Sequence, residues 1–304
     1  MRVLIVGCGY VGLPLGEELV KLGHEVHGLR RTLEGAAELE AVGIKPLAGD
    51  ISRPEDLAAL PGPFDWVVNL VSSSKGGPEI YQQVYVDGTR NLIAWLRGQA
   101  SPLKKYVYTS STSVYGQADG SPVKESSPTE PKSATSQILV EAENVVLAAV
   151  QQGFPGVVLR VAGIYGPDRG HLFQKFCRNE ARIDGDGLRI INMIHRTDVV
   201  GAVIATLKSG RAGEIYNTVD DEPVTQTTFY RWLSETLGKT MPPHAADDET
   251  TTRKRGETSK KVQNRRLKAE LGYQFKYPTF RQGYTTEIKR LQDAGLLELA
   301  KDER

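Results

Sequence analysis

Short apolar runs alternate with longer amphipathic stretches through the first half of the chain. The apolar runs predict strands, at Arg2–Val6, His24–Leu29, Ile44–Asp50, Asp65–Leu70, Lys104–Ser111 and Gly156–Gly163. The stretches between them carry apolar residues at helical spacing and predict helices, near Tyr10–Leu22, Glu34–Val42, Pro54–Leu60, Glu79–Arg97 and Pro131–Leu147. Strands that alternate with helices form a parallel sheet covered on both faces. The fold class that we predict is therefore α/β, with a doubly wound parallel sheet.

The alternation loosens after Gly166. The elements predicted there are a strand at Gly213–Val219 and helices near Thr197–Leu207, Gln226–Leu237, Asn264–Leu271 and Thr279–Ala294. We therefore expect residues 1–166 and 191–220 to form the sheet domain. Residues 167–190 and 221–304 are expected to form a smaller lobe that binds the substrate.

Residues 242–261 are almost free of apolar side chains. A loop of this length inside a compact domain is either a functional flap or disordered. Its basic run, Thr251–Lys261, is either a site for a phosphorylated substrate or a solvated run of charges, and the second is the commoner case.

A glycine-rich turn follows the first strand and opens the first helix. Gly7, Gly9 and Gly12 have the G-x-G-x-x-G spacing, and the strand–turn–helix setting favours dinucleotide binding over an ordinary turn. Gly7 permits the tight turn, Gly9 lets a pyrophosphate approach the backbone, and Gly12 allows close packing of helix and strand. The N-terminal end of the helix then faces the phosphates.

The ends of the next two strands indicate which dinucleotide is bound. Arg30 and Arg31 stand where an acidic residue would select NAD, and guanidinium groups match the 2′-phosphate of NADP. We therefore expect NADP in preference to NAD, and two solvated arginines are the alternative. Asp50 follows the third strand, where it either accepts from the adenine amino group or caps the next helix.

Charge and cysteine content narrow the class of protein. The 304 residues hold 38 Lys and Arg against 37 Asp and Glu, so no general field favours nucleic acid or a membrane surface. Cys8 and Cys177 make neither a disulfide scaffold nor a metal site. The first residues already form a strand, and no apolar run reaches membrane-spanning length, so we expect a cytoplasmic protein.

Several motifs in fixed order resemble the extended short-chain dehydrogenase/reductases of the NAD(P)-dependent epimerase/dehydratase type. They include GCGYVG, DGTRNL, YTSSTSVYG, LRVAGIYGP, INMIHRTDVVGAV and YNTVDDEPVT. The resemblance extends to about Val224 and implies a Rossmann-type fold. The cofactor-binding residues that we expect are Gly7, Gly9, Tyr10, Val11, Gly12, Arg30, Arg31, Asp50, Leu70, Val71, Ser110 and Ser111.

The resemblance also implies a catalytic set, most of which this chain lacks. Family members use an ionised Tyr, a Lys four residues later, a Ser or Thr, and an Asn. Ser111 matches the Ser, whereas Tyr85 stands at the Asn position. Thr135 and Leu139 fall at the Tyr and Lys positions, and the alcohol of threonine has far too high a pKa to replace a phenolate. The chain resembles an atypical subgroup that keeps the fold and loses these residues.

Two functions fit this combination. The first is an oxidoreductase or epimerase that acts on a small or sugar-nucleotide-like substrate with other groups. Ser111, Tyr115 and His195 are its candidate catalytic residues, and Tyr165 is a further phenol at a strand end. Packing roles are the alternative for Tyr115 and His195. The second function is a catalytically inactive sensor of NADP(H).

Extended members of this superfamily usually pair through two helices. These correspond here to about Glu79–Arg97 and Ser133–Gln151. Both stretches carry more apolar residues than one buried face needs, which favours a homodimer. Burial against the sheet explains many of the same residues.

Overall fold

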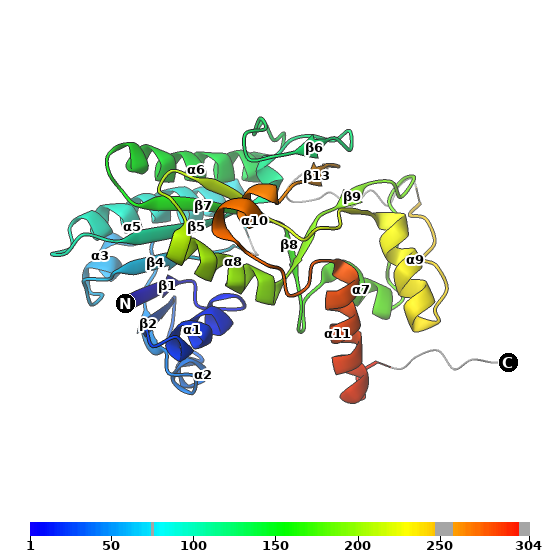
Figure 1. Ribbon diagram of the computed structural model, residues 1–304, viewed down its shortest axis with the longest axis horizontal. Helices are drawn as coiled ribbons and strands as arrows, with labels where there is room; N and C mark the ends of the chain where they lie inside the picture. Colours follow the sequence, from blue (N-terminus) through cyan, green and yellow to red (C-terminus); the bar gives the residue numbers. More distant parts are fainter. Residues whose placement is uncertain (74–75, 247–257, 298–304) are drawn as a thin grey trace.

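A seven-stranded parallel sheet forms the centre of the molecule in a computed structural model, which describes residues 1–73, 76–246 and 258–297 (Figure 1). Its strands are β1 (Arg2–Val6), β2 (Glu25–Arg30), β3 (Lys45–Ala48), β4 (Trp66–Asn69), β5 (Lys105–Ser111), β7 (Gly156–Val161) and β11 (Ile215–Thr218). They are arranged in the order β11-β7-β5-β4-β1-β2-β3. The predicted fold class is confirmed, and the apolar runs are buried on both sides, as a doubly wound sheet requires.

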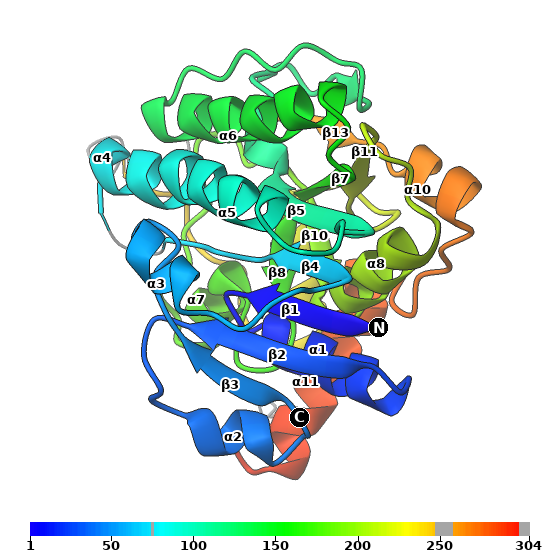
Figure 2. The ribbon, with the colours of Figure 1, turned by 90° about the vertical axis from the view of Figure 1, so that its left-hand side faces the viewer.

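Helices cover both faces of the sheet (Figure 2). On one face lie α3 (Pro54–Ala58), α4 (Pro78–Tyr81), a π-helical segment (Gln82–Asp87), α5 (Gly88–Arg97) and α6 (Ala134–Gln151). On the other face lie α1 (Gly12–Lys21) and α8 (Arg196–Ser209), while α2 (Ala36–Glu40) packs beside β3. The stretch predicted as one helix near Glu79–Arg97 is therefore three segments, and its π-helical part carries Tyr85.

A smaller lobe stands beside the carboxyl edge of the sheet. Its helices are α7 (His171–Cys177), α9 (Gln226–Leu237) and α11 (Phe280–Asp293). Short strands complete it: β8 (Gly163–Tyr165) pairs with β10 (Met193–His195), and β9 (Ile190–Ile191) pairs with β12 (Val224–Thr225). Aromatic residues dominate its separate core, among them Phe173, Phe176, Phe229, Tyr230, Phe280 and Tyr284.

Part of the C-terminal region packs with the sheet domain instead of the lobe. Leu267 of α10 (Arg265–Leu271) lies in the core of the sheet domain, and α10 packs against α8 and β11. β13 (Lys261–Val262) pairs with β6 (Pro122–Val123), which precedes α6. The boundary drawn at residue 220 therefore does not separate the two cores, because these apolar side chains are buried against the sheet domain.

The predicted flap at residues 242–261 is only partly within the described residues. Residues 247–257 lie outside them, and so does most of the basic run at 251–261. Among the helices that the structure describes, none is both long enough and apolar enough to span a bilayer.

Candidate dinucleotide-binding site

A cavity of about 1240 Å³ opens at the carboxyl edge of the sheet, beside the ends of β1 and β4. The chain runs from β1 outward through β2 and β3, then returns to β4 on the other side of β1. Ligands of doubly wound sheets bind in the crevice that this reversal creates. Of the predicted cofactor residues, all but Gly12 line this cavity, which also exceeds the usual volume of a small-molecule site.

The glycine-rich turn after β1 has the conformation that each of its glycines was predicted to allow. Gly7 has a φ of +85°, and a Cβ there would lie 3.0 Å from the backbone of Leu70 and Val71. A Cβ on Gly12 would lie 2.9 Å from the Gly7 carbonyl oxygen, whereas one on Gly9 would meet nothing within 4 Å. The backbone at Gly9 is thus open to the cavity that it lines.

Helix α1 directs its N-terminal end at this turn. The helix has no side-chain cap and no acidic residue in its first turn. Uncapped N–H groups and the helix dipole attract anions, so the start of α1 suits a phosphate group.

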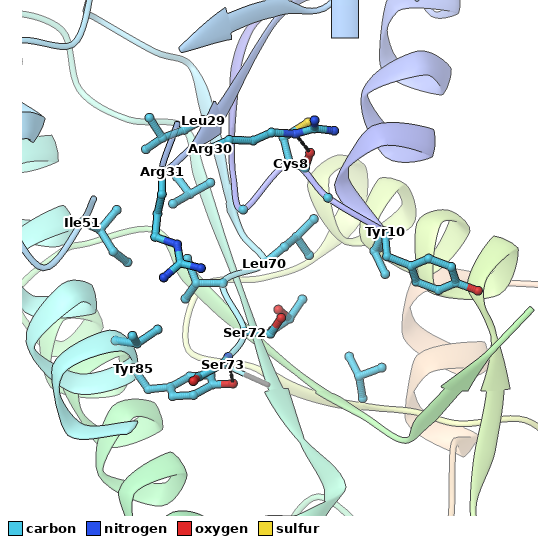
Figure 3. A pocket seen from close by; sticks show the side chains of 18 of the residues that line it. Cys8, Tyr10, Leu29, Arg30, Arg31, Ile51, Leu70, Ser72, Ser73 and Tyr85 are labelled. Carbon is cyan, nitrogen blue, oxygen red and sulfur yellow. Dashed lines mark hydrogen bonds between the residues drawn. The ribbon is translucent and has the colours of Figure 1, made fainter. Parts of the chain in front are cut away.

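The two arginines at the end of β2 have different environments (Figure 3). Arg30 donates from Nε to the Cys8 carbonyl oxygen at 2.6 Å, and its other nitrogens reach the Gly35 carbonyl oxygen and the Glu38 carboxylate at 3.3 and 3.1 Å. Arg31 is exposed and extends into the cavity. Arg30 therefore ties the glycine-rich turn to α2 and to Gly35 before it, whereas Arg31 is directed into the cavity.

Asp50 lines the cavity and also shapes its own turn. Its Oδ1 accepts hydrogen bonds from the backbone N–H of Ser52 at 2.8 Å and from the Ser52 hydroxyl at 2.7 Å. The alternative that the sequence left open beside adenine binding, a cap on the next helix, is wrong, because Arg53 is the N-cap residue of α3 and this helix has no side-chain cap. The carboxylate stays at the cavity wall in this arrangement.

Two serines at the end of β5 face the cavity. Ser110 is 8% exposed, and its Oγ has no hydrogen-bond partner among the described residues. Ser111 accepts from the backbone N–H of Ser113 at 3.2 Å. Buried hydroxyls are normally hydrogen-bonded, so the Oγ of Ser110 could bond a polar group of a ligand in the cavity.

Helix α6 brings Leu139 into the same cavity wall as the two serines. Thr135, one turn earlier, is buried and shares a 2.9 Å hydrogen bond with the Ser133 hydroxyl. Residues four apart lie on one helical face, so both occupy the side of α6 that faces the sheet domain. The positions aligned with the Tyr–Lys pair are therefore next to the candidate site.

Tyr85 supplies a phenol to the cavity from the π-helical segment (Figure 3). Its hydroxyl accepts a hydrogen bond of 3.0 Å from the backbone N–H of Ser73, which follows β4. The sequence placed Tyr85 only as the replacement of an Asn. Single π turns are frequent at functional sites, but no sequence pattern revealed this one.

Tyr115 belongs to a buried polar network and does not line the cavity. Its hydroxyl donates to the Asn217 side-chain oxygen at 2.7 Å and accepts from Arg160 at 2.9 Å. Burial raises the pKa of the phenol, and the neighbouring Arg160 only partly opposes this. The network gives Tyr115 the packing role that was the alternative to catalysis.

His195 and Tyr165 pack together in the lobe, with ring centres 5.3 Å apart, and neither residue lines the cavity. The Nδ1 of His195 accepts from the Thr197 backbone N–H at 3.1 Å and so caps α8. Burial lowers the pKa of His195 to about 4, and burial raises that of Tyr165. Asp198 holds the segment before α11, since it accepts from Tyr273 and from the backbone of Lys276 and Tyr277.

No group of three or more His, Cys, Asp or Glu side chains within the described ranges has a metal-binding arrangement. Burial raises the pKa of the Cys8 thiol to about 12, so Cys8 stays a neutral thiol. The cavity is lined by the glycine-rich turn, arginines, hydroxyl groups, the carboxylates of Glu34 and Asp50, and apolar side chains.

A doubly wound sheet with this turn and a separate lobe defines the architecture of the extended short-chain dehydrogenase/reductases. The chain belongs to the NAD dependent epimerase/dehydratase family, whose model matches residues 3–218.

Relatives and solved structures agree with this assignment. Protein YeeZ of Escherichia coli is 30% identical over 286 residues, which cover 91% of this chain and 96% of that protein. A ketoreductase of Stigmatella aurantiaca, acting on a farnesyl dihydroquinoline oxide by its name, is 28% identical over 78% of this chain and 74% of its own. The structure of the dTDP-glucose 4,6-dehydratase DesIV from Streptomyces venezuelae, with NAD and TYD bound, has a TM-score of 0.83 at 24% identity, covering 96% and 97%.

Proposed function

We propose that this protein binds NADP(H) and acts as an oxidoreductase or epimerase on a small or sugar-nucleotide-like substrate, without the usual Tyr–Lys pair. One observation carries the proposal: the glycine-rich turn, the serine pair and Leu139 line a single cavity. The open backbone at Gly9 and the unpartnered Oγ of Ser110 fit a bound dinucleotide. Sugar-nucleotide chemistry is suggested by DesIV, which carries NAD and TYD.

The chain's own groups have clear tasks in such a reaction. The nicotinamide supplies hydride transfer when it is bound. Ser111 hydrogen-bonds the substrate oxygen, and the phenol of Tyr85 is a further hydroxyl at the cavity wall. Leu139 excludes water from its part of the wall but carries no charge and binds no ribose hydroxyl.

Arg31 is the residue that we assign to the 2′-phosphate of NADP. Its side chain is exposed and lies at the cavity wall, and no carboxylate within the described ranges forms an ion pair with it (Figure 3). A guanidinium group offers paired donors to a phosphate. Arg30 supports both dinucleotides equally, because it holds the Cys8 carbonyl of the phosphate-binding turn.

Arg31→Ala should weaken NADPH binding about 10- to 100-fold, because hydrogen bonds to charged groups contribute about 1.5–3 kcal/mol each. NADH binding should change little. Arg30→Ala should weaken the binding of NADPH and the binding of NADH by the same factor. Titration calorimetry with both cofactors checks this, and equal affinity of the wild type for NADPH and NADH would contradict the NADP assignment.

A catalytically inactive NADP(H) sensor is the second candidate. The observation that favours it is the position of Tyr115, Tyr165 and His195, all of which lie outside the cavity lining. These three residues are then not available for catalysis, and Thr135 and Leu139 align with the family's Tyr–Lys pair. A sensor needs only the phosphate-binding turn. Turnover distinguishes the two functions.

We also propose a homodimer that pairs through α5 and α6. Leu92, Ile93 and Val146 are buried in the protein's own core, but Trp95, Val140 and Val145 are only partly covered. Light scattering at micromolar concentration should give the mass of a dimer, and Val145→Glu should shift it towards the monomer. A monomeric wild type would contradict the proposal.

A further inference from the structure

Arg169 reaches the cavity from a tight turn between the sheet domain and the lobe. Its backbone N–H and carbonyl exchange hydrogen bonds of 3.0 and 3.1 Å with Gly166. Asp168 and Gly170, on either side, have φ angles of 60° and 137°, so the backbone adopts a conformation that few residues tolerate. The turn is thus built into one shape, with the Arg169 side chain at the cavity wall.

The carboxylates next to this turn are occupied by another arginine. Asp168 pairs with Arg290 of α11 at 2.7 Å, and Glu287 accepts from the same guanidinium group at 2.8 and 2.9 Å. Glu287 also accepts from the backbone N–H of Asp168 at 3.3 Å. In the described parts of the chain, no carboxylate forms an ion pair with Arg169. The turn is fastened to α11 while the charge of Arg169 stays uncompensated.

The aromatic ring of Tyr10 places Arg169 beside the glycine-rich turn. The guanidinium carbon of Arg169 lies 4.9 Å from the centre of this ring, and that of Arg196 lies 4.6 Å from it. Cation–π contacts of this kind orient an arginine without neutralising it. Tyr10 follows Gly9 directly, and Arg169 lines the same cavity as these two residues, whereas Arg196 does not line it.

We propose that Arg169 binds the diphosphate of the dinucleotide from the lobe side, opposite the N–H groups at the start of α1. This assignment rests on the proposed function and deepens it. Arginine is suited to a diphosphate because its fork of donors spans two oxygens. The contact links the bound cofactor through Asp168 and Arg290 to α11, and hence to the lobe expected to hold the substrate.

Three ligands separate the diphosphate contact from the others. NADP carries both the diphosphate and the 2′-phosphate, NAD carries only the diphosphate, and adenosine 2′-monophosphate carries only the 2′-phosphate. Arg169→Ala should weaken NADP and NAD by the same factor, about 10- to 100-fold, and leave adenosine 2′-monophosphate unchanged. Arg31→Ala should instead weaken the binding of NADP and of adenosine 2′-monophosphate and leave the binding of NAD unchanged. Calorimetric titration of the full chain measures all three.

Two further variants make the test specific. Arg231→Ala removes an exposed arginine of α9 that does not line the cavity, and it should change none of the affinities. Arg169→Lys keeps the charge but not the fork of donors, and it should bind both dinucleotides with intermediate affinity.

Unchanged affinity of Arg169→Ala for NAD and NADP would overturn the proposal. So would an equal loss for adenosine 2′-monophosphate, because that pattern indicates general damage to the site. A wild type that binds none of the three ligands would instead refute the proposed function itself. The two failures are therefore distinguishable in one experiment.

Discussion

Glu143→Ala should lower the free energy of unfolding by about 3–5 kcal/mol, since the loss of one partner leaves a buried charge uncompensated. Glu143 of α6 and Arg160 of β7 are 1% and 4% exposed, and their closest nitrogen–oxygen distance is 2.7 Å. Arg160 also donates to Tyr115 and to the Glu125 carbonyl oxygen. The pair joins α6, which carries Thr135 and Leu139, to strand β7 of the sheet. Urea denaturation measures the effect.

A matched control lies on the same helix. Glu141, two residues before Glu143, pairs with Arg90 at 2.9 Å but is 44% exposed, so Glu141→Ala should cost less than about 1 kcal/mol. The double variant Glu143→Leu/Arg160→Met should recover much of the loss, because no charge is then buried. Equal effects of Glu141→Ala and Glu143→Ala would contradict the importance of the buried pair.

Hydride transfer on ordinary sugar-nucleotide, aldehyde or ketone substrates should be about 10²–10⁴-fold slower than in family members with the Tyr–Lys pair. This is the typical contribution of one positioned general acid or base. The structure places Leu139 at the cavity wall and commits the hydroxyl of Tyr115 to Arg160 and Asn217. NADPH binding should persist, because the phosphate-binding turn is complete. The absorbance of reduced nicotinamide measures turnover directly.

Thr135→Tyr combined with Leu139→Lys should raise residual turnover, if the cleft admits the substrate that is offered. Leu139→Met is a suitable control, because it keeps an apolar side chain of similar volume at the cavity wall. Wild-type turnover near that of ordinary family members, with no replacement group beside the nicotinamide, would show that the alignment of α6 with the Tyr–Lys motif is wrong.

The sheet was predictable because burial on both faces makes its strands continuous apolar runs. Every strand of the central sheet lies at or near its predicted place. The alternation of strands with helices was enough to predict the fold class. The division between domain and lobe was less predictable. Residues such as Leu267 and Val262 are far along the chain, and only tertiary packing shows which core receives them.

The glycine-rich turn was predictable, because glycines carry backbone requirements that are visible in a sequence. Gly7 has the positive φ of the predicted tight turn, and a Cβ on Gly12 would lie 2.9 Å from the Gly7 carbonyl oxygen.

The catalytic side of the site was not predictable. The position of a residue near the end of a strand does not show which way its side chain points. The hydroxyl of Tyr115, for example, points away from the cavity and is hydrogen-bonded to Arg160. Likewise, Arg30 and Arg31 are adjacent in sequence, but Arg30 is hydrogen-bonded to the Cys8 carbonyl oxygen, whereas Arg31 extends into the cavity.

A crystal structure with NADPH bound tests the central claim most directly. We expect the diphosphate at the turn formed by Gly7–Gly12, the 2′-phosphate on Arg31, and the nicotinamide beside Ser111 and Leu139. No tyrosine–lysine pair should lie within hydrogen-bond reach of the nicotinamide ribose and its C4 face. The account is contradicted if NADPH binds elsewhere, or if such a pair from another part of the chain contacts the nicotinamide.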